Sequence, residues 1–116
     1  MPVDAATLET RFENVFAVGD VNYVRLADCM LLPKAGVFAE HQAQAVARII
    51  ASRIDGGSAG RLDGGGRCYL EVGAGAAAMA DGDFLAANRR IDLKQPSIIW
   101  HWAKVAAEKY WLWHSY

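Results

Sequence analysis

The residues best placed to do chemistry are Gly19 and Asp20, which close the apolar run 15–18. A buried strand that ends in a carboxylate carries that group to the sheet edge where α/β proteins bind ligands. Gly19 has no side chain, so a ligand can approach the backbone there. Lys34-Ala35-Gly36 precede a predicted helix, whose positive N-terminal end attracts electron-rich groups. Together these segments predict a ligand cleft.

Cys68 is a second candidate because it begins the predicted strand 68–72. A redox thiol needs a lowered pKa and a nearby electron acceptor, whereas a lone cysteine in a strand is commonly a small buried hydrophobe. The residues alone leave both alternatives open. Cys29 is the only other cysteine, which excludes a disulfide-stapled scaffold. No pair of His or Cys residues has metal-ligand spacing, so no metal site is expected.

Two glycine-rich segments match phosphate-binding motifs only in part. The run from Gly73 to Ala78 has the G-x-G-x-x-A form of the dinucleotide fingerprint and follows a predicted strand. Gly82 limits any following helix to about two turns, and the alternative is an Ala/Gly hairpin. Gly64-Gly65-Gly66 is followed by neither Lys-Ser/Thr nor a helix, which favours a surface turn.

Short strands and two helices must position these residues. Residues 15–18 are expected to form a buried strand, and a helix is expected after Pro33 and before Gly56-Gly57. Its apolar stripe comprises Ala39, Ala43, Val46, Ile50 and Ile54, opposite a polar stripe of Glu40, Gln44, Arg48 and Ser52. Residues 68–72 and 84–85 are expected in an antiparallel hairpin, with residues 76–80 either strand or helix start.

The predicted fold class is therefore α+β, with a short buried strand, a central amphipathic helix, an antiparallel hairpin and a C-terminal Trp-rich helix. Its expected parts are residues 1–55, the glycine-rich loop 56–66 and residues 67–116. The chain has 116 residues, 53% of them hydrophobic, which suits one folded domain or a piece of one. A net charge of -1 provides no basic field for nucleic acid. With no signal peptide, a cytoplasmic location is expected.

All four tryptophans fall in the predicted C-terminal helix Ile98–Trp113, for which Ser97 is the expected N-cap. On a helical wheel Trp100 and Trp111 form one pair, while Trp102 and Trp113 form a second pair on another side. One small core cannot cover both sides. The second side is expected to pack on further domains, to self-associate into a homo-oligomer, or to lie on a membrane surface without spanning it.

Five blocks of sequence carry a resemblance to a known family. The blocks, in order, are Thr10, Asn14–Asp20, Leu32–Glu40, Cys68–Gly73 and Trp102–Tyr110. They are similar to the C-terminal part of FAD-dependent pyridine nucleotide-disulfide oxidoreductases, and most of all to the sulfide:quinone oxidoreductase and flavocytochrome c sulfide dehydrogenase branch. The resemblance implies a fragment of a two-Rossmann-domain flavoprotein, with its N-terminal FAD/NAD-binding domains outside this chain.

The resemblance also implies roles for individual residues. Asp20 would accept hydrogen bonds from the ribityl chain of FAD, and Gly19 would let the flavin approach. Lys34, Ala35 and Gly36 would lie near the pyrimidine end of the flavin. Cys68 matches the position of a redox cysteine in the sulfide-oxidising branch, but residues 71–75 depart from the acidic-aromatic-Gly-Asp run that is usual there.

The implied function is electron transfer from a reduced donor, sulfide or NAD(P)H, through FAD to a quinone-like acceptor at the inner face of the membrane. The chain alone is then expected to be inactive and to hold FAD weakly. Two alternatives stay open. One is a stand-alone interaction or dimerisation module without flavin, and the other is a relative of type II NADH:quinone reductases in which Cys68 is only structural.

Overall fold

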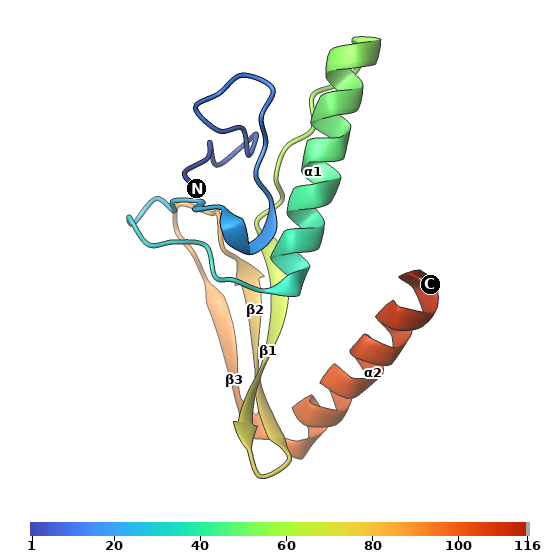
Figure 1. Cartoon of the computed structure of the whole chain (residues 1–116). Helices are drawn as coiled ribbons and strands as arrows, with labels where there is room; N and C mark the ends of the chain where they lie inside the picture. The colour runs from blue at the N-terminus through green and yellow to red at the C-terminus, as the bar shows by residue number, and fades with distance from the viewer. Residues whose placement is uncertain (116) are drawn as a thin grey trace. The chain divides into compact units, whose positions relative to one another are not determined.

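A computed structural model describes residues 1–115 and confirms the α+β class, with two α-helices and a three-stranded antiparallel sheet (Figure 1). The elements in order are the 3-10 helix η1 (Gly19–Val21), α1 (Gly36–Asp55), β1 (Gly65–Gly73), β2 (Ala76–Asp83), β3 (Ile91–Ser97) and α2 (Ile98–Ser115). They form two compact units. Unit 1 comprises Met1–Gly66 and Asp83–Arg90, and unit 2 comprises Arg67–Gly82 and the chain from Ile91 onward.

The buried strand expected over residues 15–18 does not form, and this prediction was wrong. Phe16 makes only an isolated bridge with Glu9. Val15 and Val18 are exposed, and only Ala17 of the run is buried. The physical reason is that no neighbouring strand in unit 1 offers a ladder of backbone partners, without which a short extended run is not a stable strand.

Arg53 of α1 holds the loop that replaces this strand. Its guanidinium donates to both carboxylate oxygens of Glu9, at 2.9 and 2.6 Å, and to Oδ1 of Asn14 at 2.7 Å. The hydrogen bond from Arg53, assisted by the backbone N–H of Asn14, lowers the pKa of Glu9 to about 2. The ionised carboxylate of Glu9, which accepts two hydrogen bonds from Arg53, therefore attaches the loop to the last turn of α1.

Helix α1 ends where the sequence predicts, but it buries a different face. Gly56 adopts a left-handed conformation at φ 70° and its N–H donates to the carbonyl of Ser52, as in a glycine C-cap. The predicted apolar stripe was wrong, since Ile50 and Ile54 are 42% and 77% exposed. The buried residues of the helix are Phe38, Gln42, Ala45 and Ile49. The buried side of α1 includes the polar residue Gln42. The hydrophobic pattern of the sequence therefore pointed to the adjacent, more apolar side, which is exposed.

The core of unit 1 joins α1 to the segment that follows β2. The rings of Phe38 and Phe84 meet edge to face, with centroids 4.9 Å apart. The N–H of Phe84 donates to the carbonyl of Gly64 at 2.8 Å. Residues 84–85 therefore lie in a packed turn of unit 1 rather than in a hairpin strand, contrary to the sequence prediction.

Unit 2 is built on the hairpin of β1 and β2. Gly73, Ala74 and Gly75 all have positive φ and form the turn between the strands. Because β2 begins at once and no helix follows, the dinucleotide fingerprint is excluded and the hairpin alternative is confirmed. Strand β2 continues through Gly82 and ends at Asp83.

Strand β3 was not foreseen from the sequence. It pairs antiparallel with β2, with Ala80 opposite Leu93 and Gly82 opposite Ile91. Every residue of β3 except Ser97 is exposed, so the strand carries no buried alternate residues that would mark it. In contrast, residues 77–80 of the central strand β2 are all buried.

Helix α2 confirms the predicted C-terminal helix and its N-cap. The N–H of Trp100 donates to Oγ of Ser97 at 3.4 Å. Glu71 of β1 contacts the first turns of the helix, with Oε1 lying 3.1 Å from Nδ1 of His101 and 3.2 Å from Nζ of Lys104. Among residues 1–115, neither helix combines the length and the apolar character that crossing a bilayer requires.

Candidate functional site

The start of α1 leaves backbone donors unused. Its N-cap residue, Ala35, has no side-chain hydrogen bond to the helix. The N–H groups of Phe38 and Ala39 both donate to the carbonyl of Ala35, at 3.1 Å each. The first helical N–H groups, those of Gly36 and Val37, have no such acceptor. An uncapped first turn without acidic residues carries the full positive end of the helix dipole.

Helix η1 brings Gly19 and Asp20 to the same place. Gly19 has φ 72°, a left-handed conformation that favours glycine. A Cβ atom there would lie 3.8 Å from Cβ of Ala39, an ordinary contact. Backbone conformation, rather than lack of space, is therefore what requires glycine at this position. The side chain of Asp20 is exposed and makes no hydrogen bond to another described residue, so its carboxylate is free to accept.

A buried amide pair fixes η1 against α1. Oε1 of Gln42 accepts from the N–H of Gly19 at 2.7 Å and from Nδ2 of Asn22 at 2.8 Å. Nδ2 of Asn22 also donates to the carbonyl of Ala17 at 2.9 Å. Asn22 and Gln42 are 1% and 3% exposed. The network satisfies the buried amide groups that would otherwise carry a desolvation cost.

Lys34 makes two contacts within unit 1. Its ammonium donates to the backbone carbonyl of Asn22 and lies 5.4 Å from the centroid of the Tyr23 ring, a cation–π arrangement. These contacts fasten the segment before α1 to the segment after η1. The ammonium of Lys34 is therefore engaged within the protein, beside the depression that this residue lines.

The structure thus brings together four of the five residues predicted to contact a cofactor. Gly19, Asp20, Lys34 and Ala35 line one depression that is too narrow to admit a water molecule in this conformation, and Gly36 begins the helix beside it. Asn22 and Gln42, which sequence reasoning missed, line it too. The signal for Gln42 was a polar residue that interrupts helical apolar spacing, which usually indicates a solvated face, and Asn22 gave no signal.

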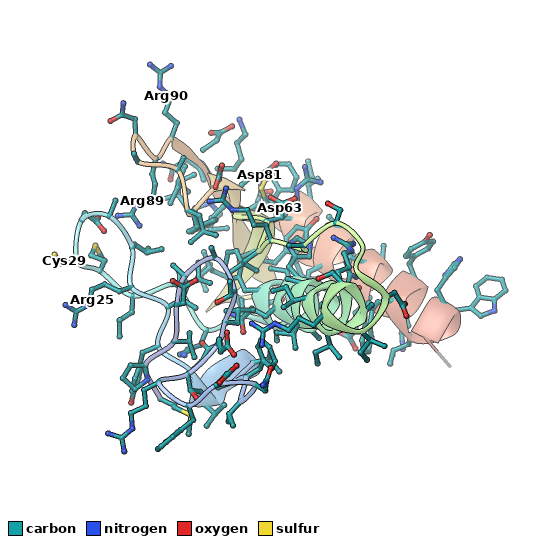
Figure 2. All side chains as sticks on the ribbon, turned by 90° about the horizontal axis from the view of Figure 1, so that it is seen from above. Arg25, Cys29, Asp63, Asp81, Arg89 and Arg90 are labelled. Atoms are coloured by element: carbon teal, nitrogen blue, oxygen red, sulfur yellow. The ribbon has the colours of Figure 1, made fainter. Side chains whose placement is uncertain are left out.

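Cys68, the second sequence-predicted site residue, belongs to unit 2. Its thiol is half-buried and unpaired, and desolvation by burial raises its pKa. A raised pKa opposes thiolate chemistry. Cys29 is exposed in unit 1, and Figure 2 shows it with Arg25 on a loop away from α1. Both cysteines are free, and residues 1–115 contain no group of three His, Cys, Asp or Glu side chains able to hold a metal ion.

Comparison of the chain with protein-family models, with characterised proteins and with solved structures finds no match. The function of the chain must therefore be argued from its own geometry.

Proposed function

We propose that unit 1 is the flavin-contacting part of an FAD-dependent oxidoreductase that passes electrons from a reduced donor to a quinone-like acceptor. One observation carries the proposal. Gly19, Asp20 and Ala35 converge on one depression, beside a helix start with unused N–H groups. A free carboxylate next to free backbone donors matches the mixed hydrogen-bonding needs of a ribityl chain and a flavin ring.

The residues divide the binding task by their chemistry. The carboxylate of Asp20 would accept hydrogen bonds from ribityl hydroxyls. The N–H groups of Gly36 and Val37, with the helix dipole, would stabilise negative charge on the pyrimidine end of the ring. Bound FAD would supply the two-electron chemistry between donor and acceptor. The remaining contacts would come from N-terminal FAD/NAD-binding domains, so the chain alone should bind flavin weakly.

The environment of Cys68 bears on the electron donor. A half-buried thiol whose pKa is raised by desolvation is poorly suited to the thiolate chemistry that a redox disulfide requires. This observation favours NAD(P)H over sulfide as donor, with Cys68 acting as a small core residue. It corresponds to the type II NADH:quinone reductase alternative, within the same class of flavoprotein.

The flavin proposal predicts weak, localised binding by the isolated chain. Titration with riboflavin or FAD should shift the amide NMR signals of residues 19–20 and 34–37, whereas AMP should leave them unchanged. Asp20→Asn should weaken flavin binding roughly tenfold or more, because charge-assisted hydrogen bonds contribute about 1.5–3 kcal/mol each. Glu13→Gln, at an exposed acid outside the depression, is the matched control. Flavin binding that leaves these amides unmoved would contradict the proposal.

The outward face of α2 favours a second candidate function, that of an association module. Ile99, Trp102, Tyr110 and Trp113 are between 61% and 84% exposed and share one side of the helix by their spacing. Trp100, His101 and Lys104 lie on another side and are half-buried. Trp111, which shares the side of Trp100, is also exposed, at 47%, but less so than Trp102 and Trp113. We assign the more exposed pair, Trp102 and Trp113, to a membrane surface or to a second copy of the chain.

Replacing Trp102 and Trp113 together with serine should abolish association through this face. With the native chain we expect a blue shift of tryptophan emission on adding phosphatidylcholine–phosphatidylglycerol vesicles if the partner is lipid. A concentration-dependent increase in sedimentation coefficient is expected instead if the partner is a second copy. Trp100→Phe, on the half-buried side, should retain either behaviour. A monomeric chain indifferent to vesicles would rule out this function.

A further inference from the structure

Strand β1 forms a free edge of the sheet in unit 2. The strand order is β1-β2-β3, so the outer side of β1 pairs with no other strand in the described part of the chain. Just before β1, the N–H of Phe84 donates to the carbonyl of Gly64. Because the bonding direction alternates along a strand, even-numbered residues of β1 bond toward β2 and odd-numbered ones point away. The backbone groups of Arg67, Tyr69 and Glu71 therefore lie on the free edge.

Two side-chain contacts support this alignment of β1 with β2. The N–H of Gly65, an odd-numbered residue, donates to Oδ1 of Asp63 at 2.9 Å instead of to β2. The alignment also places Arg67 opposite Asp81, and Nη2 of the arginine lies 2.7 Å from Oδ2 of the aspartate. The odd-numbered side chains of β1 therefore share one face of the sheet, and the even-numbered ones share the other.

The two outer strands of the sheet differ in how they are protected. Natural proteins protect exposed sheet edges with lysine, proline or a bulge, because an unprotected edge pairs with other chains. Strand β3 has all three, namely Lys94, Pro96 and an irregularity opposite residues 77–79 of β2. Strand β1 contains neither lysine nor proline, and its residues from Leu70 to Gly73 are all exposed. The edge of β1 is therefore the one that is open to an added strand.

The charged residues of β1 are complementary to a second copy of the same strand. Arg67 and Glu71 lie on one face, two residues on either side of Tyr69. If two copies pair antiparallel with Tyr69 opposite Tyr69, each arginine lies opposite the glutamate of the other copy. Centring the pair one residue away leaves both charges without an opposite charge, and centring it two residues away places like charges opposite each other. Charge complementarity therefore selects the register centred on Tyr69.

Both charged side chains retain bonding capacity for such a partner. The side chains of Arg67 and Glu71 are 57% and 37% exposed. Asp81 accepts hydrogen bonds from Nε and Nη2 of Arg67, which leaves Nη1 free. The carboxylate of Glu71 contacts His101 and Lys104 of α2, and its two oxygens have about four acceptor positions in all. An ion pair between copies would therefore add to these contacts without replacing them.

We propose that β1 pairs antiparallel with β1 of a second copy, about a two-fold axis at Tyr69, and so joins the two three-stranded sheets into one. The same edge is used by both copies, so the interface closes as a dimer. Backbone hydrogen bonds of the odd-numbered residues supply affinity, and the Arg67–Glu71 pairs fix the register. This surface is separate from the flavin contacts and from the α2 face with Trp102 and Trp113, so the proposal depends on neither proposed function.

Cysteine placement tests the register. Leu70 would lie opposite Cys68 of the other copy, at a pair without backbone hydrogen bonds, where Cα atoms are about 4.5 Å apart and a disulfide can form. In a Cys29→Ser background, Leu70→Cys should give a covalent dimer on a non-reducing gel after oxidation with copper–phenanthroline. The Cys29→Ser chain alone and its Val72→Cys variant should give several-fold less, because their cysteines would lie diagonally, about 7–8 Å apart.

Proline at residue 69 tests the backbone pairing. Tyr69→Pro removes an N–H that points away from β2, a position at which an edge strand tolerates proline. It should abolish the cross-link of the Leu70→Cys chain and the concentration dependence of the sedimentation coefficient that arises from this edge. Tyr69→Ala is the matched control, because it removes the ring and keeps the N–H, and it should retain the cross-link. Circular dichroism verifies that both variants stay folded.

A further control separates this edge from the outward face of α2. Replacing Trp102 and Trp113 with serine should leave the Leu70→Cys cross-link unchanged, and its loss would assign the association to α2 and overturn the proposal. The proposal is also overturned if Leu70→Cys gives no more covalent dimer than Val72→Cys, or if folded Tyr69→Pro cross-links as well as Tyr69→Ala. The comparison of the two cysteine positions decides the outcome even if the proline variant does not fold.

Discussion

Gln42→Met is expected to lower the free energy of unfolding of unit 1 by about 2–4 kcal/mol, because each buried donor left without an acceptor costs about 1–3 kcal/mol. Methionine preserves the length of the side chain and most of its packing while removing the acceptor oxygen. The N–H of Gly19 and one proton of the Asn22 amide would then be unpaired. Urea unfolding followed by hydrogen exchange of the α1 amides measures the loss. Tryptophan fluorescence would not, since all four tryptophans belong to unit 2.

The same helix supplies a matched control for this substitution. Gln44 is exposed, and its amide makes only a 3.3 Å hydrogen bond to Glu40. Gln44→Met should therefore change stability by less than about 0.5 kcal/mol. A double-mutant cycle with Asn22→Ala should show strong non-additivity, because the two side chains share one network. Equal stability of Gln42→Met and Gln44→Met would show that the buried network contributes nothing.

Local signals in the sequence were sufficient for the helices and their ends. Gly56 terminates α1 because a left-handed C-cap is a property of that residue, and Ser97 caps α2 by a bond within one turn. The Gly73–Gly75 turn likewise follows from residues that tolerate positive φ. Such features depend on neighbours in sequence, so composition and spacing reveal them.

Features that depend on distant partners were not predicted. Residues 15–18 have the composition of a strand, but strand formation requires a paired neighbour, and unit 1 provides none. The buried face of α1 depends on Asn22 and Gly19, which make burial of Gln42 favourable. Strand β3 is stabilised by its pairing with β2, and its own sequence has no alternation of buried and exposed residues that would predict a strand.

The candidate site also combines features that the sequence predicts with features that depend on distant partners. The residue types and the helix dipole predicted that Gly19 and Asp20 lie near the start of α1, and the structure places them at one depression. The engagement of Lys34 with the carbonyl of Asn22 could not be foreseen, because no sequence pattern specifies where a long flexible side chain finds its acceptor. That Cys68 belongs to unit 2 was equally hidden until the chain was seen to divide at residue 66.

Gly64→Ala should lower the free energy of unfolding by roughly 3 kcal/mol, about as much as Gln42→Met, because of steric overlap. A Cβ atom at residue 64 would lie 2.2 Å from Oδ1 of Asp83, 2.6 Å from Cβ of Leu85 and 2.7 Å from its backbone nitrogen. Overpacking usually costs about 1–3 kcal/mol, and this turn has little freedom to yield. Oδ1 of Asp83 accepts from the N–H groups of Leu85 and Ala86, and the N–H of Phe84 donates to Gly64 itself.

Substitutions at two other glycines provide a comparison for the cost of Gly64→Ala. At Gly57 a Cβ atom would meet nothing within 4 Å, so Gly57→Ala should leave stability unchanged or raise it slightly by restricting the unfolded chain. At Gly66 a Cβ atom would meet the ring of Phe38 at 2.6 Å. Because a ring can tilt where a hydrogen-bonded backbone cannot, Gly66→Ala should fall between the other two. Thermal unfolding should therefore give midpoints in the order Gly57→Ala, Gly66→Ala, Gly64→Ala, from highest to lowest. A Gly64→Ala variant as stable as Gly57→Ala would mean that the turn at residues 83–86 can move away from residue 64 at no cost, and that the core contact of Phe38 with Phe84 does not depend on it.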